Sequence, residues 1–152
     1  MAPMVSSIEI VRPPGEVYAY VTDPSRFGEW QRDVVAVRIE GGRPGGAGSR
    51  FTTTRRIGGS DRSMTQEVTE ADAPRRWAAR AVGGPVRPSA TVTVEPLGDG
   101  TGSRVTFTLD FEGHGLGRSL LPLVRRQAQR AAPVSYRTLK ERLERGDDLR
   151  GR

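Results

Sequence analysis

Residues 116–145 constrain the fold more than any other part of this sequence, because they have the pattern of one long amphipathic helix after a series of short strands. At about 100° per residue, small and apolar side chains fall on one side of this helix and arginines fall mostly on the other. The apolar side holds Leu116, Leu120, Val124, Ala128, Ala131 and Ser135, and the other side holds Arg118, Arg125, Arg126, Arg130 and Arg137. Pro122 fits the first turn if Ser119 is the N-cap.

The segments before this helix predict strands, because apolar and polar residues alternate and many side chains are β-branched. The predicted strands are residues 6–11, 34–40, 49–57, 63–71, 77–82, 89–96 and 104–112, with turns that draw on the chain's 19 glycines and 11 prolines. Two short helices are expected after the first strand. One enters at Pro13-Pro14 and ends at Asp23-Pro24, and the other runs from Pro24 to about Gln31.

This order predicts an α+β fold in which a curved, seven-stranded antiparallel sheet wraps around the C-terminal helix. Seven strands cannot bury both faces of a sheet alone, and this helix is the only large amphipathic element available to cover one face. We expect a single domain over residues 1–145 and a frayed tail over residues 146–152.

An internal cavity is expected between helix and sheet. Small side chains on the inner side of the helix, such as Ala128 and Ala131, would leave space rather than fill it. The two short helices would then close the open end of the sheet. Phe27 and Trp30, two large rings within the polar stretch 23–34, would form the lid or the floor of the cavity.

The composition excludes several classes of chemistry. With no cysteine and one histidine, the chain has no disulfide, no thiol nucleophile and no metal site made of cysteines or a histidine pair. We expect no metal and no cofactor. No run of about 18 apolar residues predicts a membrane span, and the first residues lack a signal-peptide pattern. A cytoplasmic protein without integral membrane association is therefore expected.

The net charge of +6 comes entirely from the C-terminal part. Residues 1–116 carry 14 basic and 14 acidic side chains, whereas residues 117–152 carry 10 basic and 4 acidic ones. Nucleic-acid binding is not expected, because no aromatic residues for base stacking are interleaved with the helix arginines and Glu141 and Glu144 interrupt them. A solvated helix face explains these arginines more simply.

Three segments resemble one known group of proteins. They are IEIVRPPGEVYAYVTDPSRFGEWQRDVVAV, EVTEADAPRRWAAR, and RVTFTLDFEGHGLGRSLLPLV followed by LKERLE. Over residues 4–145 the chain resembles the START/Bet v 1-like (SRPBCC) superfamily, in its polyketide cyclase/dehydrase-like branch. The resemblance implies the helix-grip fold and a hydrophobic cavity between helix and sheet. Members of this superfamily include lipid carriers, hormone receptors and aromatase/cyclases.

The family geometry suggests which side chains face the cavity. The candidates are Phe27, Trp30, Phe51, Met64, Trp77, Phe107, Phe111, Leu120, Val124 and Gln127, with Val105 and Leu109 on the same face of the last strand. Each apolar candidate is either an ordinary core residue or a ligand contact. The sequence does not separate the two, because ligand pockets are themselves mostly apolar. Gln127 either bonds a strand or water, or orients a ligand. A side-chain-filled interior smaller than the roughly 300 Å³ typical of ligand pockets would count against any function that depends on this cavity.

Catalytic residues are less well defined. His114, at the end of the last strand, is a candidate general acid or base, although it lies among three glycines where an exposed turn histidine is ordinary. The phenols are Tyr18, Tyr20 and Tyr136, and the strand charges Arg55, Glu67, Arg80 and Asp110 have no fixed facing. No cyclase catalytic motif maps onto the chain.

Three functions remain open. The chain binds a hydrophobic or amphipathic small molecule, lipid- or polyketide-like, or it is a cofactor-independent cyclase, aromatase or dehydratase that uses the same cavity. Alternatively, it is an interaction module that uses Arg125, Arg126 and Arg130. Ionisable groups that converge inside the cavity would favour catalysis, and a uniformly apolar wall would favour carriage. A monomer and a homodimer are equally compatible with the sequence.

Overall fold

A computed structural model of the chain describes residues 2–41 and 46–146. The strands are β1 (Met4–Ile10), β2 (Val34–Gly41), β3 (Arg50–Ile57), β4 (Ser60–Asp72), β5 (Arg76–Ala81), β6 (Val86–Leu97) and β7 (Gly102–Gly113). The helices are α1 (Pro14–Val21), the 3₁₀ turn η1 (Pro24–Arg26), α2 (Phe27–Trp30) and α3 (Gly117–Arg145). The predicted strands and the long helix are all present.

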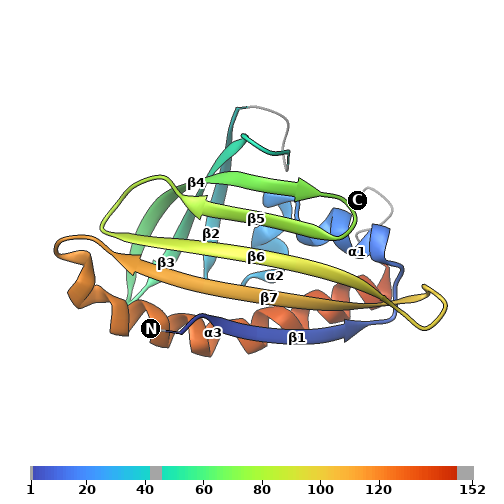
Figure 1. The fold of residues 1–152 in the computed structure, drawn as a ribbon. Helices are drawn as coiled ribbons and strands as arrows, with labels where there is room; N and C mark the ends of the chain where they lie inside the picture. Colours follow the sequence, from blue (N-terminus) through green and yellow to red (C-terminus); the bar gives the residue numbers. More distant parts are fainter. Residues whose placement is uncertain (1, 42–45, 147–152) are drawn as a thin grey trace.

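The strands form one antiparallel sheet in the order β1-β7-β6-β5-β4-β3-β2. Register shifts in β2 and, between Val68 and Glu70, in β4 let the sheet bend, because a bulge increases the local twist. Figure 1 shows the result: the sheet curves over α3, and α1 and α2 lie at one end of the space between them. This arrangement confirms the predicted helix-grip fold.

Two local details differ from the predictions. The turn between β3 and β4 is tighter than residues 58–62, which separate the two predicted strands, because Gly58 and Gly59 both adopt positive φ, as a two-residue hairpin turn requires. The long helix has Leu116, not Ser119, as its N-cap. Gly117 starts the helix against the β5–β6 loop, where a Cβ on Gly117 would overlap the Pro85 carbonyl oxygen.

The core lies where α1, α2 and the C-terminal half of α3 meet the concave face of the sheet. Ile10, Val17, Val21, Val68, Val94, Val105, Leu139 and Leu143 are almost fully buried there. At its C-terminal end α3 is capped by Gly146, which has φ 75°, and most of the predicted tail, residues 147–152, lies outside the described residues. No described helix is long and apolar enough to cross a membrane.

Candidate functional site

The space between the concave face of the sheet and α3 contains a cavity of about 150 Å³. Nine of the ten predicted cavity residues line it: Phe27, Trp30, Phe51, Met64, Trp77, Phe107, Phe111, Val124 and Gln127. Leu109 also lines it, whereas Val105 is fully buried in the core beside it. Whether these residues contact a ligand stays a prediction.

A second cavity of about 100 Å³ adjoins the first. The remaining predicted residue, Leu120, lines this second cavity together with Leu123 and Val86. The two cavities share Ile57, Met64, Pro88, Phe111 and Val124, so a thin wall of side chains separates them. The internal space is therefore divided, with the smaller part under the first turns of α3.

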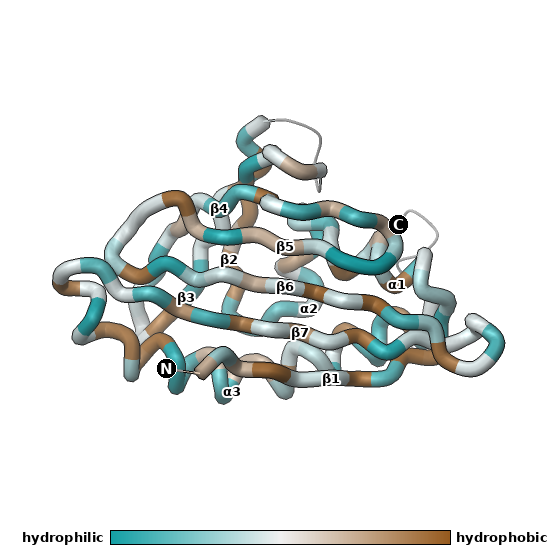
Figure 2. The backbone as a smooth tube through the Cα atoms, viewed as in Figure 1, coloured by the Kyte–Doolittle hydropathy of each residue, from teal (hydrophilic) through white to brown (hydrophobic). Residues whose placement is uncertain are grey.

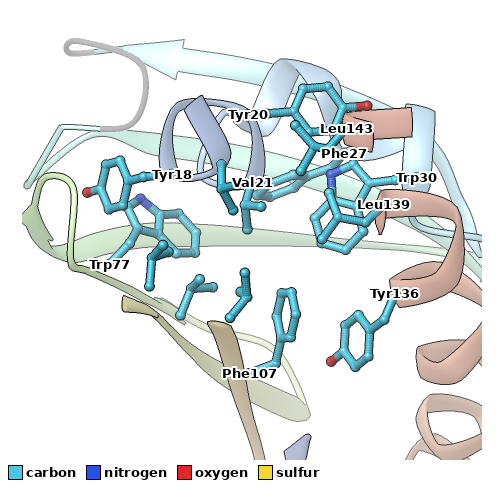
Figure 3. Packing of buried hydrophobic residues seen from close by; sticks show 14 of the residues in the cluster. Tyr18, Tyr20, Val21, Phe27, Trp30, Trp77, Phe107, Tyr136, Leu139 and Leu143 are labelled. Carbon is cyan, nitrogen blue, oxygen red and sulfur yellow. The ribbon is translucent and has the colours of Figure 1, made fainter. Parts of the chain in front are cut away.

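The main cavity is smaller than the roughly 300 Å³ typical of ligand pockets, because aromatic rings occupy much of the interior. Phe27 packs edge-on against Trp30, Phe51 and Trp77, with ring centroids 5.7–6.2 Å apart. Figure 3 shows Phe27, Trp30 and Trp77 on one side of this space, with Phe107 and Tyr136 across from them. Phe27 and Trp30 thus form one wall of the cavity and are part of the core at the same time.

Small side chains on α3 keep the remaining space open. Ala128, Ala131, Ala132 and Ser135 line the cavity along the inner side of the helix, as their small size predicts. Ser135 also accepts a hydrogen bond from the Arg32 backbone N–H, 2.9 Å from its Oγ, which ties α3 to the loop after α2. A larger residue in this stripe would occupy the cavity.

One part of the wall is polar. Arg55 on β3 donates from Nη1 to Asp33 Oδ1 at 2.6 Å and from Nη2 to Gln31 Oε1 at 2.5 Å. All three residues line the cavity, where the loop between α2 and β2 meets β3. The ion pair balances the charges, so this polar cluster brings hydrogen-bonding groups into the cavity without a net charge.

Tyr136 on α3 extends the polar cluster toward the helix. Its ring stacks on Phe107 with centroids 4.0 Å apart and an interplanar angle of 11°. Burial raises the pKa of Tyr136 to about 12, although the nearby Arg55 guanidinium opposes this rise. The phenol therefore keeps its proton at neutral pH and can donate a hydrogen bond to an oxygen atom in the cavity.

Two glutamines complete the polar lining. Gln66 on β4 accepts a 3.2 Å hydrogen bond at Oε1 from Thr53 Oγ1, which leaves its amide N–H₂ as a donor for the cavity. Gln127 donates from Nε2 to the Arg56 carbonyl oxygen on β3 at 3.5 Å, and it also lines the cavity. Gln31, Asp33 and Gln66 were absent from the sequence-based candidates.

The indole N–H groups of Trp30 and Trp77 have no hydrogen-bond partner within the described part of the chain. Both nitrogens are fully buried, so a ligand atom reaches them only if the rings shift. An unmade hydrogen bond of this kind costs about 1–3 kcal/mol. The rings are held here by packing, which offsets that cost.

Several residues considered from the sequence lie away from the cavity. His114 lines neither cavity; it is exposed, and its Nε2 lies 3.6 Å from Glu112 Oε1.

The phenols of Tyr18 and Tyr20 form their hydrogen bonds outside the cavity. Tyr18 donates to the Arg76 carbonyl oxygen, and Tyr20 donates to Glu29 Oε1. Of the four strand charges without a fixed facing, only Arg55 lines the cavity; Glu67, Arg80 and Asp110 do not.

Comparisons with known proteins agree with this architecture. Residues 1–144 match the model of the family described as polyketide cyclase/dehydrase and lipid transport. No curated protein sequence matches the chain.

Solved structures share the fold at low sequence identity. TTHA0849 from Thermus thermophilus is 21% identical, with a TM-score of 0.77 over 96% of this chain and 99% of that one. The Zhui aromatase/cyclase from Streptomyces sp. R1128 is 15% identical, with a TM-score of 0.81 over 98% and 97%. A START superfamily protein from Mycobacterium smegmatis is 17% identical, with a TM-score of 0.74 over 95% and 99%. With its helix-grip fold, its internal cavity and this match, the chain belongs to the polyketide cyclase/dehydrase and lipid transport family.

Proposed function

We propose that the protein binds a compact, uncharged, oxygen-bearing hydrophobic molecule in the cavity between sheet and α3. The observation that carries this proposal is an apolar, ring-lined cavity with one polar cluster, formed by Arg55, Asp33, Gln31 and Tyr136. The rings would contact the apolar body of the ligand, and the polar cluster would hold its oxygen atoms.

The charge balance of the cluster favours a neutral ligand group. Arg55 is already paired with Asp33, so a carboxylate brought into the cavity would meet the Asp33 carboxylate as well as the guanidinium. A ketone or hydroxyl oxygen can instead accept from Tyr136 or Gln66 without an uncompensated charge. Ketones and phenols of the polyketide type fit this requirement better than a fatty acid does.

The volume sets the size of the ligand. A cavity of about 150 Å³ accommodates a single aromatic ring of benzene size. A larger ligand would need the space of the second cavity, and the shared side chains of Met64, Phe111 and Val124 would have to rearrange. Met64 and Val124 are only half-buried, so they are the parts of this wall that can move most easily.

Titration with acetophenone and benzoate tests this proposal, because the two molecules share a ring and differ in charge. The only two tryptophans of the chain, Trp30 and Trp77, both line the cavity, so their fluorescence, corrected for ligand absorption, reports its occupancy. We expect saturable binding of acetophenone at least tenfold tighter than that of benzoate. Equal or tighter binding of benzoate would contradict a neutral ligand, and no saturable binding of either would contradict the binding proposal.

A second candidate, ring closure of a linear poly-ketone, is favoured by the ionisable groups that converge in the cavity. Asp33 can take a proton from a carbon next to a carbonyl group of the poly-ketone, and the enolate that results attacks a second carbonyl carbon of the same molecule. Tyr136 and Arg55 can stabilise the negative charge that develops on the oxygen of that second carbonyl group. Loss of one water molecule then yields an aromatic ring. The fold similarity to the Zhui aromatase/cyclase is compatible with this chemistry.

Heptane-2,4,6-trione tests the second candidate, because its carbon–carbon ring closure with loss of water gives 5-methylresorcinol. Nuclear magnetic resonance should detect this product faster with the protein than with buffer. Tyr136→Phe should slow its formation at least tenfold, and His114→Ala, outside the cavity, should leave it unchanged. No acceleration at concentrations where the trione saturates the tryptophan signal would reject catalysis of this reaction and leave binding in place.

A further inference from the structure

One end of the molecule exposes three large apolar side chains. Leu116 is 86% exposed, Leu123 is 46% exposed and Val82 is 42% exposed. They make up half of the large hydrophobic residues that are exposed in the described parts of the chain. Figure 2 shows hydrophobic segments at this end, where the β5–β6 loop and the first turns of α3 lie. We call this region, residues 58–62, 82–87 and 112–126, the loop end.

The loop end is a connected surface. The His114 backbone N–H donates to the Pro85 carbonyl oxygen at 2.8 Å, which joins the β7–α3 loop to the β5–β6 loop. Leu123 reaches the β3–β4 turn, where its Cδ2 would lie 3.7 Å from a Cβ placed on Gly58. Leu116 and Leu123, seven residues apart, lie within about 20° of each other around the helix axis.

The loop end carries more arginines than carboxylates. The segments of the loop end and the residues directly beside them carry two carboxylates, Asp61 and Glu112, and six arginines: Arg56, Arg62, Arg87, Arg118, Arg125 and Arg126. Asp61 pairs with Arg56, and Glu112 lies opposite Arg87 in the sheet register and near His114. The loop end thus combines solvent-exposed leucines with an excess of positive charge.

We propose that the loop end docks on an anionic lipid surface, with Leu116 and Leu123 inserted among the lipids and Arg118 and Arg126 against the phosphates. Apolar side chains beside basic ones are what a peripheral membrane site requires, because each contributes to binding and neither alone is sufficient. A second copy of the chain is a poor occupant, since two positively charged loop ends would repel each other. The loop end lies on the outside of the molecule, so its docking on lipid does not depend on which ligand the cavity binds.

The position of this surface gives it a role in access to the interior. Leu123 is half-exposed at the surface and lines the second cavity as well. Leu120 and Val86 line that cavity beside it. A lipid surface that contacts the loop end would therefore lie directly outside the smaller cavity.

Vesicle co-sedimentation tests the docking surface with the ligand-free protein. We expect binding to vesicles of phosphatidylcholine with phosphatidylserine, weak binding to phosphatidylcholine alone, and a loss of binding as salt rises. Arg118→Gln with Arg126→Gln should lower the affinity roughly twentyfold, and Leu116→Gln should lower it roughly tenfold.

Matched controls separate this surface from general charge and apolarity. Arg130→Gln with Arg137→Gln removes the same charge from exposed positions further along α3, and Val11→Gln replaces a side chain that is 71% exposed near the opposite end of the sheet. Both should change vesicle affinity less than threefold. The proposal would be overturned if the control variants lost as much vesicle affinity as the test variants, or if the protein bound both vesicle types equally. It would also be overturned if the protein bound immobilised poly-glutamate but no vesicles. Unchanged circular dichroism of every variant would show that the fold is intact.

Discussion

At the scale of single residues, Trp30 has two roles that a sequence alone does not separate. Its ring lines the cavity and packs against Phe27 and Phe107, and only 5% of the residue is exposed. Its N–H makes no hydrogen bond among the described residues, so nothing polar holds it in place. Packing is therefore the main reason for a tryptophan at this position in an otherwise polar stretch.

Trp30→Ala should lower the free energy of unfolding by about 3–5 kcal/mol, because it removes a large buried ring and leaves a void among the other rings. Urea unfolding measures this loss. Arg32→Ala, two residues away and not among the buried side chains, should cost less than about 1 kcal/mol. A loss at Trp30 as small as that at Arg32 would mean that the ring is a cover for the cavity rather than part of the core.

Tyr136 gives the protein a characteristic response to alkaline pH. The folded state raises the pKa of Tyr136 from about 10 to about 12, so it keeps a proton that the unfolded chain has lost. The unfolded state then binds fewer protons, and stability falls as pH rises from about 10 toward 12. Tyr136→Phe should flatten this fall by roughly 1 kcal/mol per pH unit. Melting temperatures between pH 8 and pH 12 measure it, and an unchanged slope would contradict the assignment to Tyr136.

At the scale of the elements, strand alternation explains which parts of the site a sequence can predict. Phe51, Thr53 and Ile57 of β3 are buried, and Arg55 shares their face because side chains alternate along a strand. The same rule, applied from Phe51, would have directed Arg55 to the cavity. Applied to β4, β5 and β7, the same alternation turns Glu67, Arg80 and Asp110 away from the cavity. None of these three residues lines the cavity in the structure.

The parts that the sequence did not predict depend on loops and on side-chain packing. Gln31 and Asp33 lie in the loop after α2, where no periodicity sets the facing of a side chain, and they reach Arg55 because the Arg56 N–H donates to the Asp33 carbonyl. The cavity size depends on how the aromatic rings pack, and composition carries no information on that. The strand order and the long helix, by contrast, follow from periodicity that extends over many residues.

The C-terminal end of α3 is capped by a residue from the other end of the chain. Arg12 donates from Nε to the Leu143 carbonyl at 2.8 Å and from Nη2 to the Glu144 carbonyl at 3.2 Å. A cation at this terminus also interacts favourably with the helix dipole. Arg12→Ala should therefore lower the free energy of unfolding by about 1–2 kcal/mol, and the exposed Arg137→Ala should change it by less than about 0.5 kcal/mol in the same denaturation series. Equal effects would exclude a specific cap.

At the scale of the whole molecule, the cavity exists because α3 presents small residues to a wall of rings. Ala131→Leu adds three carbon atoms to the cavity side of α3 and should abolish acetophenone binding. The free energy of unfolding should change by less than about 1.5 kcal/mol, because the added atoms enter existing space. Ala78→Leu, on the opposite face of the sheet, is the matched control and should bind acetophenone normally. Retained binding in Ala131→Leu would place the ligand elsewhere.

The strand order has a consequence for synthesis on the ribosome. β1 pairs with β7 in a register that joins Met4 to Leu109, so about 100 residues separate partners in one ladder. The concave face of the sheet also stays uncovered until α3, the last helix, has been made. Newly made chains must therefore hold β1 without its partner and leave many apolar residues open to solvent, a state that favours aggregation and chaperone binding. Folding should complete only after release of the C-terminal helix from the ribosome, in one late and cooperative step.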